Sequence, residues 1–278
     1  MLCIIFRCLK LLNENHYVPM KNKVAVILAS SKGLGKASAF SLAREGCNLA
    51  LCARGGEALK QTADEIRKET GVAVFTRQLD VQNREMMRGF IQEVTEEYGA
   101  IHVLVTNSGG PPPGTSRSLG DEEWDEAVQS TLMVAIDWTR AVAPLMIKQE
   151  WGRIVHITSI SVKQPIDGLI LSNTMRVGVV GYAKSVSREL APHNILVNTL
   201  CPGSFHTDRL RALAENRASA TGSTAEEAFK HMAADVPLGR IGDAREMGDV
   251  VAFLSSERAS YMTGTTIQVD GGVYRGMM

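Results

Sequence analysis

Short apolar runs alternate with segments of helical spacing along almost the whole chain. Seven runs have the length of strands buried on both faces: Val24–Leu28, Asn48–Cys52, Val72–Gln78, Ile101–Thr106, Arg153–Thr158, Ile195–Leu200 and Thr266–Val269. Helical spacing covers Leu34–Glu45, Glu57–Glu69, Asn83–Tyr98, Asp121–Gln149, Leu171–Leu190, Arg209–Ala234 and Ala244–Leu254. Because strands and helices alternate, we predict an α/β fold with a doubly wound parallel sheet and helices on both faces.

The pattern shows no boundary between domains. No repeat, low-complexity tract or linker interrupts the alternation, so residues 20–278 are expected to form a single domain. Met20 lies directly before the first strand, and we therefore expect residues 1–19 to be an N-terminal extension outside the core. The alternative for this extension is a short amphipathic contact with a membrane.

Composition argues against several classes of protein. The 30 basic and 30 acidic residues cancel, which argues against the broad positive face of a nucleic-acid-binding protein. No apolar run reaches the roughly 18–20 residues that a membrane span needs. The 5 cysteines are scattered and lack the spacing of a metal site, so we expect a cytoplasmic protein without a bound metal.

A glycine-containing turn joins the first strand to the first helix. Gly33 and Gly35 let the backbone approach a pyrophosphate, and the helix N-terminus behind them supplies free N–H groups and a partial positive charge. Two glycines alone are weak evidence, but their position at this junction predicts a dinucleotide site. The Pro- and Gly-rich loop 109–120 and the polar segment 208–235 follow other strands, and we expect them to contact a small-molecule substrate.

Over roughly residues 22–272 the chain resembles the short-chain dehydrogenase/reductase family, whose members have a Rossmann fold, and in particular its 3-oxoacyl-carrier-protein reductase-like members. Leu28 and Ala29 stand where the family usually has Thr and Gly, and Ala29 fits that turn only if its φ is negative. More specific matches are Asp80-Val81, Thr106–Gly109, Cys201–Thr207, Pro237–Gly242 and Val269–Gly272. The resemblance implies that the dinucleotide contacts Ala29, Ser31, Lys32, Gly33, Leu34, Gly35, Arg54, Asp80, Val81, Asn107, Gly109, Arg176, Pro202, Gly203, Phe205 and Thr207.

The residues that end the second strand favour NADP over NAD. A carboxylate at this point would hydrogen-bond a free ribose 2′-hydroxyl, and the chain has Leu51–Arg54 there instead. Arg54 and Lys32 offer two cations to a 2′-phosphate. The alternative is that both are solvated surface cations and that the cofactor is NAD.

The resemblance also implies a catalytic Ser, Tyr and Lys, with an Asn on the preceding long helix. An alignment without gaps puts Ser159 at the Ser, Ser172 at the Tyr, Arg176 at the Lys and Thr131 at the Asn. Arg176 keeps a cation but does not itself give up a proton. Ser172 is the serious change, because an aliphatic hydroxyl lacks the accessible titration of a phenol, so a relay through Arg176 needs another acid or water.

Five other side chains are candidates for the missing proton donor. Lys163 lies four residues after Ser159 in the loop expected to line the substrate pocket, and a partly buried lysine has a lowered pKa. Asp167 is a weaker candidate in the same loop, and His206 in the nicotinamide turn is another. Tyr182 is out of phase with the helix face of Ser172, and His156 lies inside a strand, so we expect both to be packing residues.

Three functions remain open. The first is an NADP-dependent oxidoreductase that acts on a carbonyl or alcohol through an altered site, and the second is a dinucleotide-binding sensor or structural partner without turnover. The third is a non-redox enzyme that uses the same pocket for dehydration or isomerisation.

Arg209, Arg211 and Arg217 are the only candidates for an anion site in the helical insertion, so an acyl-carrier substrate is neither required nor excluded. Apolar residues on more than one face of the segments 121–149 and 171–190 predict a homo-oligomer, a tetramer or a dimer.

Overall fold

A computed structural model of the protein describes residues 20–277, except for the side chains of Arg217 and Ala220. The expected N-terminal extension, residues 1–19, lies outside the described residues. Met20 begins the described part, and its side chain is fully buried against the core beside the first strand.

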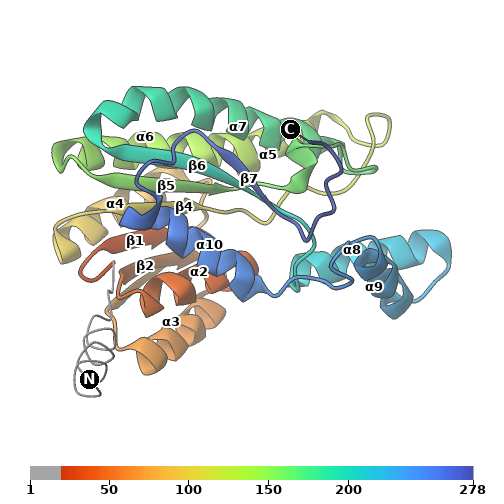
Figure 1. Ribbon diagram of the computed structural model, residues 1–278, viewed down its shortest axis with the longest axis horizontal. Helices are drawn as coiled ribbons and strands as arrows, with labels where there is room; N and C mark the ends of the chain where they lie inside the picture. The colour runs from red at the N-terminus through yellow and green to blue at the C-terminus, as the bar shows by residue number, and fades with distance from the viewer. Residues whose placement is uncertain (1–19, 278) are drawn as a thin grey trace, which may run out of the picture.

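Seven strands form one parallel sheet in the order β3-β2-β1-β4-β5-β6-β7 (Figure 1). Their bounds are β1 (Val24–Ile27), β2 (Asn48–Ala53), β3 (Val74–Gln78), β4 (Val103–Thr106), β5 (Gly152–Ile157), β6 (Ile195–Pro202) and β7 (Thr266–Val269). The chain starts in the middle at β1, winds outward to β3, then returns to β4 and winds the other way to β7. This confirms the doubly wound sheet and places the reversal between β1 and β4, where such sheets bind ligands.

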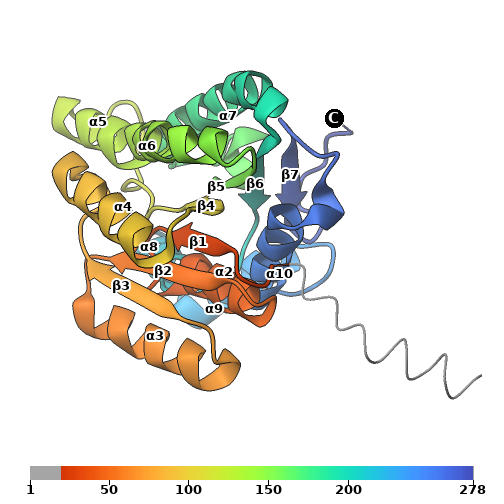
Figure 2. The ribbon, with the colours of Figure 1, turned by 90° about the vertical axis from the view of Figure 1, so that its left-hand side faces the viewer.

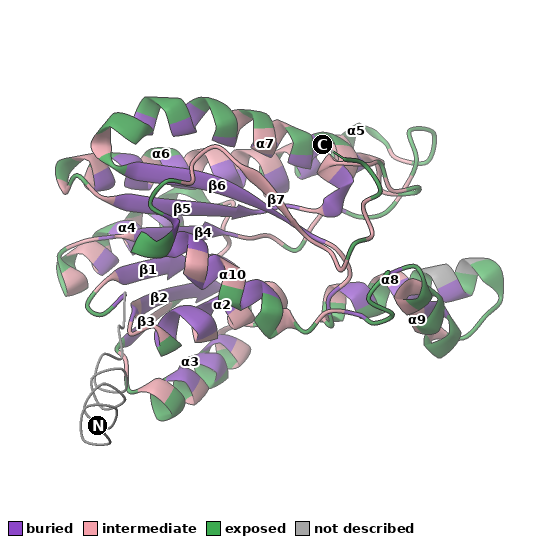
Figure 3. Cartoon of the chain, viewed as in Figure 1, coloured by how far each residue is buried: buried purple, intermediate pink, exposed green. Residues whose placement is uncertain are grey.

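Helices cover both faces of the sheet (Figure 2). One face carries α2 (Gly33–Arg44), α3 (Gly56–Thr70) and α10 (Ala244–Ser255), and the other carries α4 (Arg84–Tyr98), α6 (Val134–Lys148) and α7 (Ile170–Leu190). Successive residues of β1 alternate between the two apolar layers: Ala25 and Ile27 pack toward α2 and α10, and Val24 and Val26 pack toward α4 and α6. Figure 3 shows the central strands buried, and every residue of β1, β4, β5 and β6 is buried, which explains their apolar sequence, whereas the edge strands β3 and β7 are only partly buried.

The long predicted helix 121–149 is interrupted. It consists of α5 (Asp121–Ala127), a π-helical segment η1 (Val128–Met133) and α6. A π-helical turn inserts an extra residue into the helix, so it changes which residues of α5 and α6 face the sheet. Thr131 lies inside this segment.

The predicted insertion 209–234 forms two helices, α8 (Asp208–Thr221) and α9 (Ala225–Ala234), beyond the carboxyl ends of the strands (Figure 1). Gly222, with φ of 66°, ends α8, and Thr224 starts α9 by accepting a hydrogen bond from the Glu227 N–H. The two helices pack on each other through a small apolar cluster. No helix in the described part of the chain has both the length and the apolar composition needed to cross a membrane.

Candidate active site

A cavity of about 1060 Å³ opens at the carboxyl ends of the strands. The loops that follow each of β1 to β6 line it, together with α7 and the first turns of α8. Every residue assigned above to the dinucleotide lines this cavity except Gly35, which lies behind the loop. The residues that the sequence predicted to contact the dinucleotide therefore come from separate loops and lie around one cavity.

The turn after β1 has a backbone that differs from the expectation for Ala29. Ala29 has a φ of 48°, so the prediction of a negative φ was wrong. A left-handed alanine costs about 1–2 kcal/mol. Hydrogen bonds on both sides hold it there, because Leu28 N–H donates to Val105 O at 3.0 Å and Ser30 N–H donates to Cys52 O at 3.1 Å.

Gly33 and Gly35 serve the turn in two different ways. Gly33 has a φ of 53°, and a Cβ on it would lie 3.3 Å from Thr207 Cγ2 across the cavity. A Cβ on Gly35 would lie 2.4 Å from Ala29 O, so only glycine lets α2 start this close to the turn. The N-terminus of α2 has no side-chain cap and no acidic residue in its first turn, which leaves its N–H groups free for an anion. The residues present therefore fit a dinucleotide pyrophosphate.

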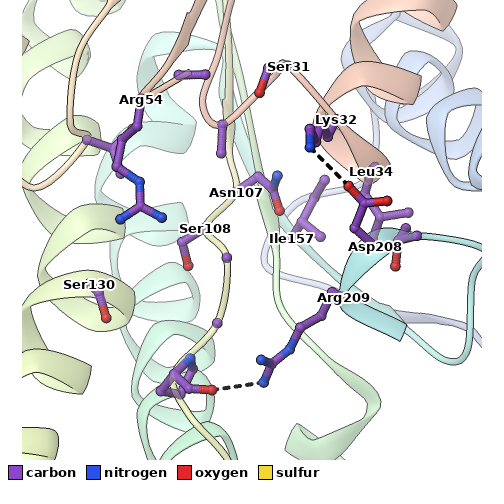
Figure 4. Close-up of a pocket in the computed structure, with 18 of the residues that line it drawn as sticks. Ser31, Lys32, Leu34, Arg54, Asn107, Ser108, Ser130, Ile157, Asp208 and Arg209 are labelled. Atoms are coloured by element: carbon purple, nitrogen blue, oxygen red, sulfur yellow. Dashed lines mark hydrogen bonds and ion pairs between the residues drawn. The ribbon is translucent and has the colours of Figure 1, made fainter. Parts of the chain in front are cut away.

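Arg54 and Lys32 face the part of the cavity near β2 and the glycine turn (Figure 4). Lys32 Nζ lies 3.3 Å from an Asp208 carboxylate oxygen, and both side chains are exposed, so this pair contributes little to stability. Arg54 makes no ion pair within residues 20–277. Of the two cations, Arg54 is the one whose charge is not already matched.

Ser159, Ser172 and Arg176 lie together along the cavity. Ser159 follows β5 and accepts a hydrogen bond from the Ser161 N–H at 3.0 Å, which fixes the turn that carries it. Ser161 Oγ lies 3.4 Å from Ser172 Oγ, so one contact between hydroxyl groups joins the turn after β5 to α7. Ser172 is 7% exposed and stands one helical turn before Arg176 on α7.

Arg176 is a buried cation held by backbone oxygens. Its side chain is 9% exposed, and Nη1 donates to Thr158 O at 2.6 Å and to Ile157 O at 3.3 Å. Nε is buried without a partner in the described part of the chain. The pKa of Arg176 is lowered to about 10, chiefly by burial and to a smaller extent by repulsion from Arg209.

Thr131 reaches the site from the other side of Arg176. It does not line the large cavity, but it lines a separate cavity of about 10 Å³ together with Arg176. Thr131 Oγ1 is buried and has no hydrogen-bond partner within residues 20–277. The π-helical segment therefore places a buried hydroxyl at a small cavity that Arg176 also lines.

The structure keeps the alternative proton donors away from the large cavity. Lys163 is half-buried and Asp167 exposed, and neither lines it; His206 stacks on Phe229 at 6.5 Å between ring centroids. His156 lies in the core, where Nδ1 bonds Thr106 Oγ1 at 2.8 Å while Nε2 has no partner among the described residues. Tyr182 packs its ring against His156, as expected of a packing residue.

Arg209, which the sequence offered only as one of three candidates for an anion site, lines the cavity. It stands in the first turn of α8, and its Nη2 donates to Pro111 O at 2.8 Å in the loop after β4 (Figure 4). Burial lowers its pKa. Its position two residues after Thr207, in the predicted nicotinamide turn, was the available signal. Other lining residues outside the predicted site include Ser108, Ser130, Leu169 and Leu213.

Comparison with known proteins agrees with this geometry. The family model described as enoyl-(acyl carrier protein) reductase matches residues 28–274, and the chain belongs to the short-chain dehydrogenase/reductase family. The 3-oxoacyl-[acyl-carrier-protein] reductase FabG of Aquifex aeolicus is 32% identical over 257 residues, which cover 92% of this chain and 99% of that protein.

Two solved reductases have the same fold. The L-sorbose reductase of Gluconobacter frateurii, complexed with NADPH and L-sorbose, gives a TM-score of 0.89 at 29% identity and covers 94% of this chain and 99% of its own. The actinorhodin polyketide ketoreductase with NADPH gives a TM-score of 0.88 at 33% identity, with coverage of 91% and 98%.

Proposed function

We propose that the protein is an NADP-dependent oxidoreductase that interconverts a carbonyl compound and an alcohol, with Ser172 and Arg176 in place of the usual Tyr and Lys. The observation that carries the proposal is the convergence of Ser159, Ser172 and Arg176 on the cavity that also gathers the dinucleotide residues. Similarity to reductases solved with NADPH supports the choice of cofactor, and so does the unmatched cation at Arg54.

The glycine turn would hold the pyrophosphate, and Arg54 the 2′-phosphate, of a bound NADP. The bound cofactor supplies the hydride donor or acceptor. The chain's own residues orient the substrate: the hydroxyl groups of Ser159 and Ser172 donate hydrogen bonds to the carbonyl oxygen. Arg176 places a positive charge beside the same oxygen, in surroundings where burial strengthens electrostatic stabilisation of developing negative charge.

Proton delivery is the step in which this site differs from that of its relatives. Arg176 is engaged with Thr158 O and Ile157 O, so its role is charge stabilisation. The proton reaches the oxygen from water through the hydroxyl groups of Ser172 and Ser161, which lie 3.4 Å apart. Such a route lacks a tuned phenol, and we expect slow turnover on generic ketones.

A dinucleotide-binding protein without turnover is the second candidate, because three of the four catalytic positions are substituted. The test first measures the affinity for NADPH by fluorescence. It then measures the rate of NADPH oxidation with a panel of carbonyl compounds. Binding with turnover supports the reductase, and binding without turnover supports a sensor or structural role. Non-redox chemistry would give product without any change in NADPH.

The cysteines bear on the compartment that we propose. Cys47, Cys52 and Cys201 are free and buried, and the pKa of each thiol is raised by burial. Unpaired thiols of this kind are typical of the reducing cytoplasm, where we propose that the protein acts.

A further inference from the structure

Two arginine side chains converge beside Gly110, in the loop after β4. A methyl group placed on Gly110 would have three guanidinium nitrogens as its nearest neighbours: Nη2 of Arg176 at 3.2 Å, and Nε and Nη2 of Arg209 at 3.8 Å. Arg176 comes from α7 and Arg209 from α8, and both line the large cavity. The cavity therefore has a corner bounded by N–H donors from two separate helices.

Nothing in the described part of the chain neutralises this pair of cations. None of the ion pairs within residues 20–277 includes Arg176 or Arg209. Their hydrogen bonds go to the neutral carbonyls of Ile157, Thr158 and Pro111, and Arg176 Nε has no partner. Like charges that are partly desolvated and unpaired are costly, so the arrangement favours a bound anion.

The corner is built before any ligand arrives. Arg209 holds Pro111 O, and the other end of the same loop is fixed where Gly114 N–H donates to Gly168 O at 2.6 Å and Ile170 N–H donates to Gly114 O at 3.3 Å. Three consecutive prolines restrict the backbone between these anchors. A preformed pair of planar guanidinium groups suits the two oxygens of a carboxylate.

We propose that Arg176 and Arg209 bind the carboxylate of an oxo-acid substrate, whose carbonyl lies at Ser159 and Ser172. Residues four apart on a helix have Cβ atoms about 5–6 Å apart, so the carboxylate and the carbonyl must lie close together on the substrate, with at most one carbon atom between them. This describes a 2-oxo or 3-oxo acid. The inference rests on the proposed carbonyl reduction and adds the class of substrate to it.

The reaction balances without a further reagent. The oxo acid takes one hydride and one proton and becomes the hydroxy acid, while NADPH becomes NADP⁺. The C=O double bond becomes a C–O single bond, and the carboxylate is unchanged. The hydride comes from the cofactor and the proton from water, as in the proposed function.

The test measures binding in the absence of turnover. Protein loaded with NADP⁺ cannot reduce a carbonyl, so the dissociation constants of pyruvate and acetoacetate can be compared by calorimetry with those of their methyl esters. At least one acid should bind 10-fold or more tightly than its ester. Arg209→Met should abolish that preference by weakening the acid alone, and Arg209→Lys should retain part of it. The exposed neighbour Arg211 gives the matched control Arg211→Met, which should behave as the parent.

Three binding results and one kinetic result would overturn the proposal. The first is equal binding of each acid and its ester, and the second is an Arg209→Met variant that binds the acid as the parent does. The third is an Arg209→Met variant that weakens NADP⁺ by the same factor as the acid, because the arginines would then serve the cofactor. Reduction of neutral ketones without a preference for acids would refute this site alone. Acid binding without NADPH oxidation would refute the proposed reductase and leave the anion site intact.

Discussion

Ser172 and Arg176 stand one turn apart on α7, and both side chains are buried along the cavity that gathers the dinucleotide residues. This spacing puts a hydroxyl and a cation on one helix face. The hydroxyl lies 3.4 Å from Ser161 Oγ, and the cation is tied to the carbonyl that ends β5 and the one after it. The pair therefore offers hydrogen bonds and positive charge to a substrate oxygen, but it has no phenol that could donate a proton.

Changing Arg54 should reduce the preference for NADPH over NADH. Arg54→Asp replaces a charge-assisted contact to the 2′-phosphate by repulsion, and loss of the contact alone costs about 1.5–3 kcal/mol. NADPH affinity should therefore fall at least about 10-fold while NADH affinity changes little. Titrations of both cofactors measure this, with Arg88→Asp on the exposed face of α4 as control. An unchanged preference in Arg54→Asp would remove Arg54 from the cofactor site.

The buried His156 should make stability depend on pH. Burial lowers its pKa to about 4, from an ordinary value near 6.5. Between those values the unfolded chain binds the proton and the folded chain does not, so this contribution to the free energy of unfolding falls as the pH drops from 6.5 toward 4. The loss between pH 7 and pH 5 should be about 2 kcal/mol larger in the parent than in His156→Gln. Urea denaturation at both pH values measures it, with His193→Gln as control. Equal losses in parent and His156→Gln would refute the assignment.

We expect the exposed face of α7 to pack against a second copy of the chain. Val177 is 50% exposed in the single chain, although it lies in the middle of the helix. The family resemblance implies pairing of the long helices across a twofold axis, so we expect a tetramer by light scattering at micromolar concentration. Val177→Asp should shift the mass toward a smaller assembly, whereas Met86→Asp, on exposed α4, should not. A monomeric parent would contradict this prediction.

The sequence predicted the sheet well because its strands are buried on both faces. Every residue of β1, β4 and β5 is buried, and such strands appear as continuous apolar runs. It did not predict the φ of Ala29, because the turn is held by hydrogen bonds that Leu28 and Ser30 donate to carbonyls of β4 and β2, which are distant in sequence. The π-helical segment around Thr131 and the approach of Arg209 to Arg176 could not be predicted from the sequence either, because both depend on packing between separate elements.

Restoring the usual residues should restore ordinary reductase chemistry on neutral carbonyl compounds. Ser172→Tyr, Arg176→Lys and Thr131→Asn together supply a phenol with a cation one turn away, and the phenol would project into the cavity that Ser172 lines. General acid catalysis is worth about 10²–10⁴-fold, so kcat with a diketone should rise within that range. The control replaces Ser172 by Phe in the same background, which fills the space without the hydroxyl.

Two outcomes would count against this account of the substituted site. If the Phe variant is as active as the Tyr variant, the phenol is not the missing group. If the parent already matches ordinary reductases on neutral diketones, another group delivers its proton. Lys163→Met would then be the next variant to measure.

The most direct test of the central claim follows the hydrogen that the cofactor transfers. NADPH deuterated at C4 of the nicotinamide is incubated with the protein and a panel of oxo acids and neutral carbonyl compounds, and the products are analysed by mass spectrometry. We predict an alcohol that carries deuterium on the former carbonyl carbon, formed in a one-to-one ratio with NADP⁺ and lost in Arg176→Met. Tight binding of NADPH with no deuterium in any product would contradict the claim that this is an oxidoreductase.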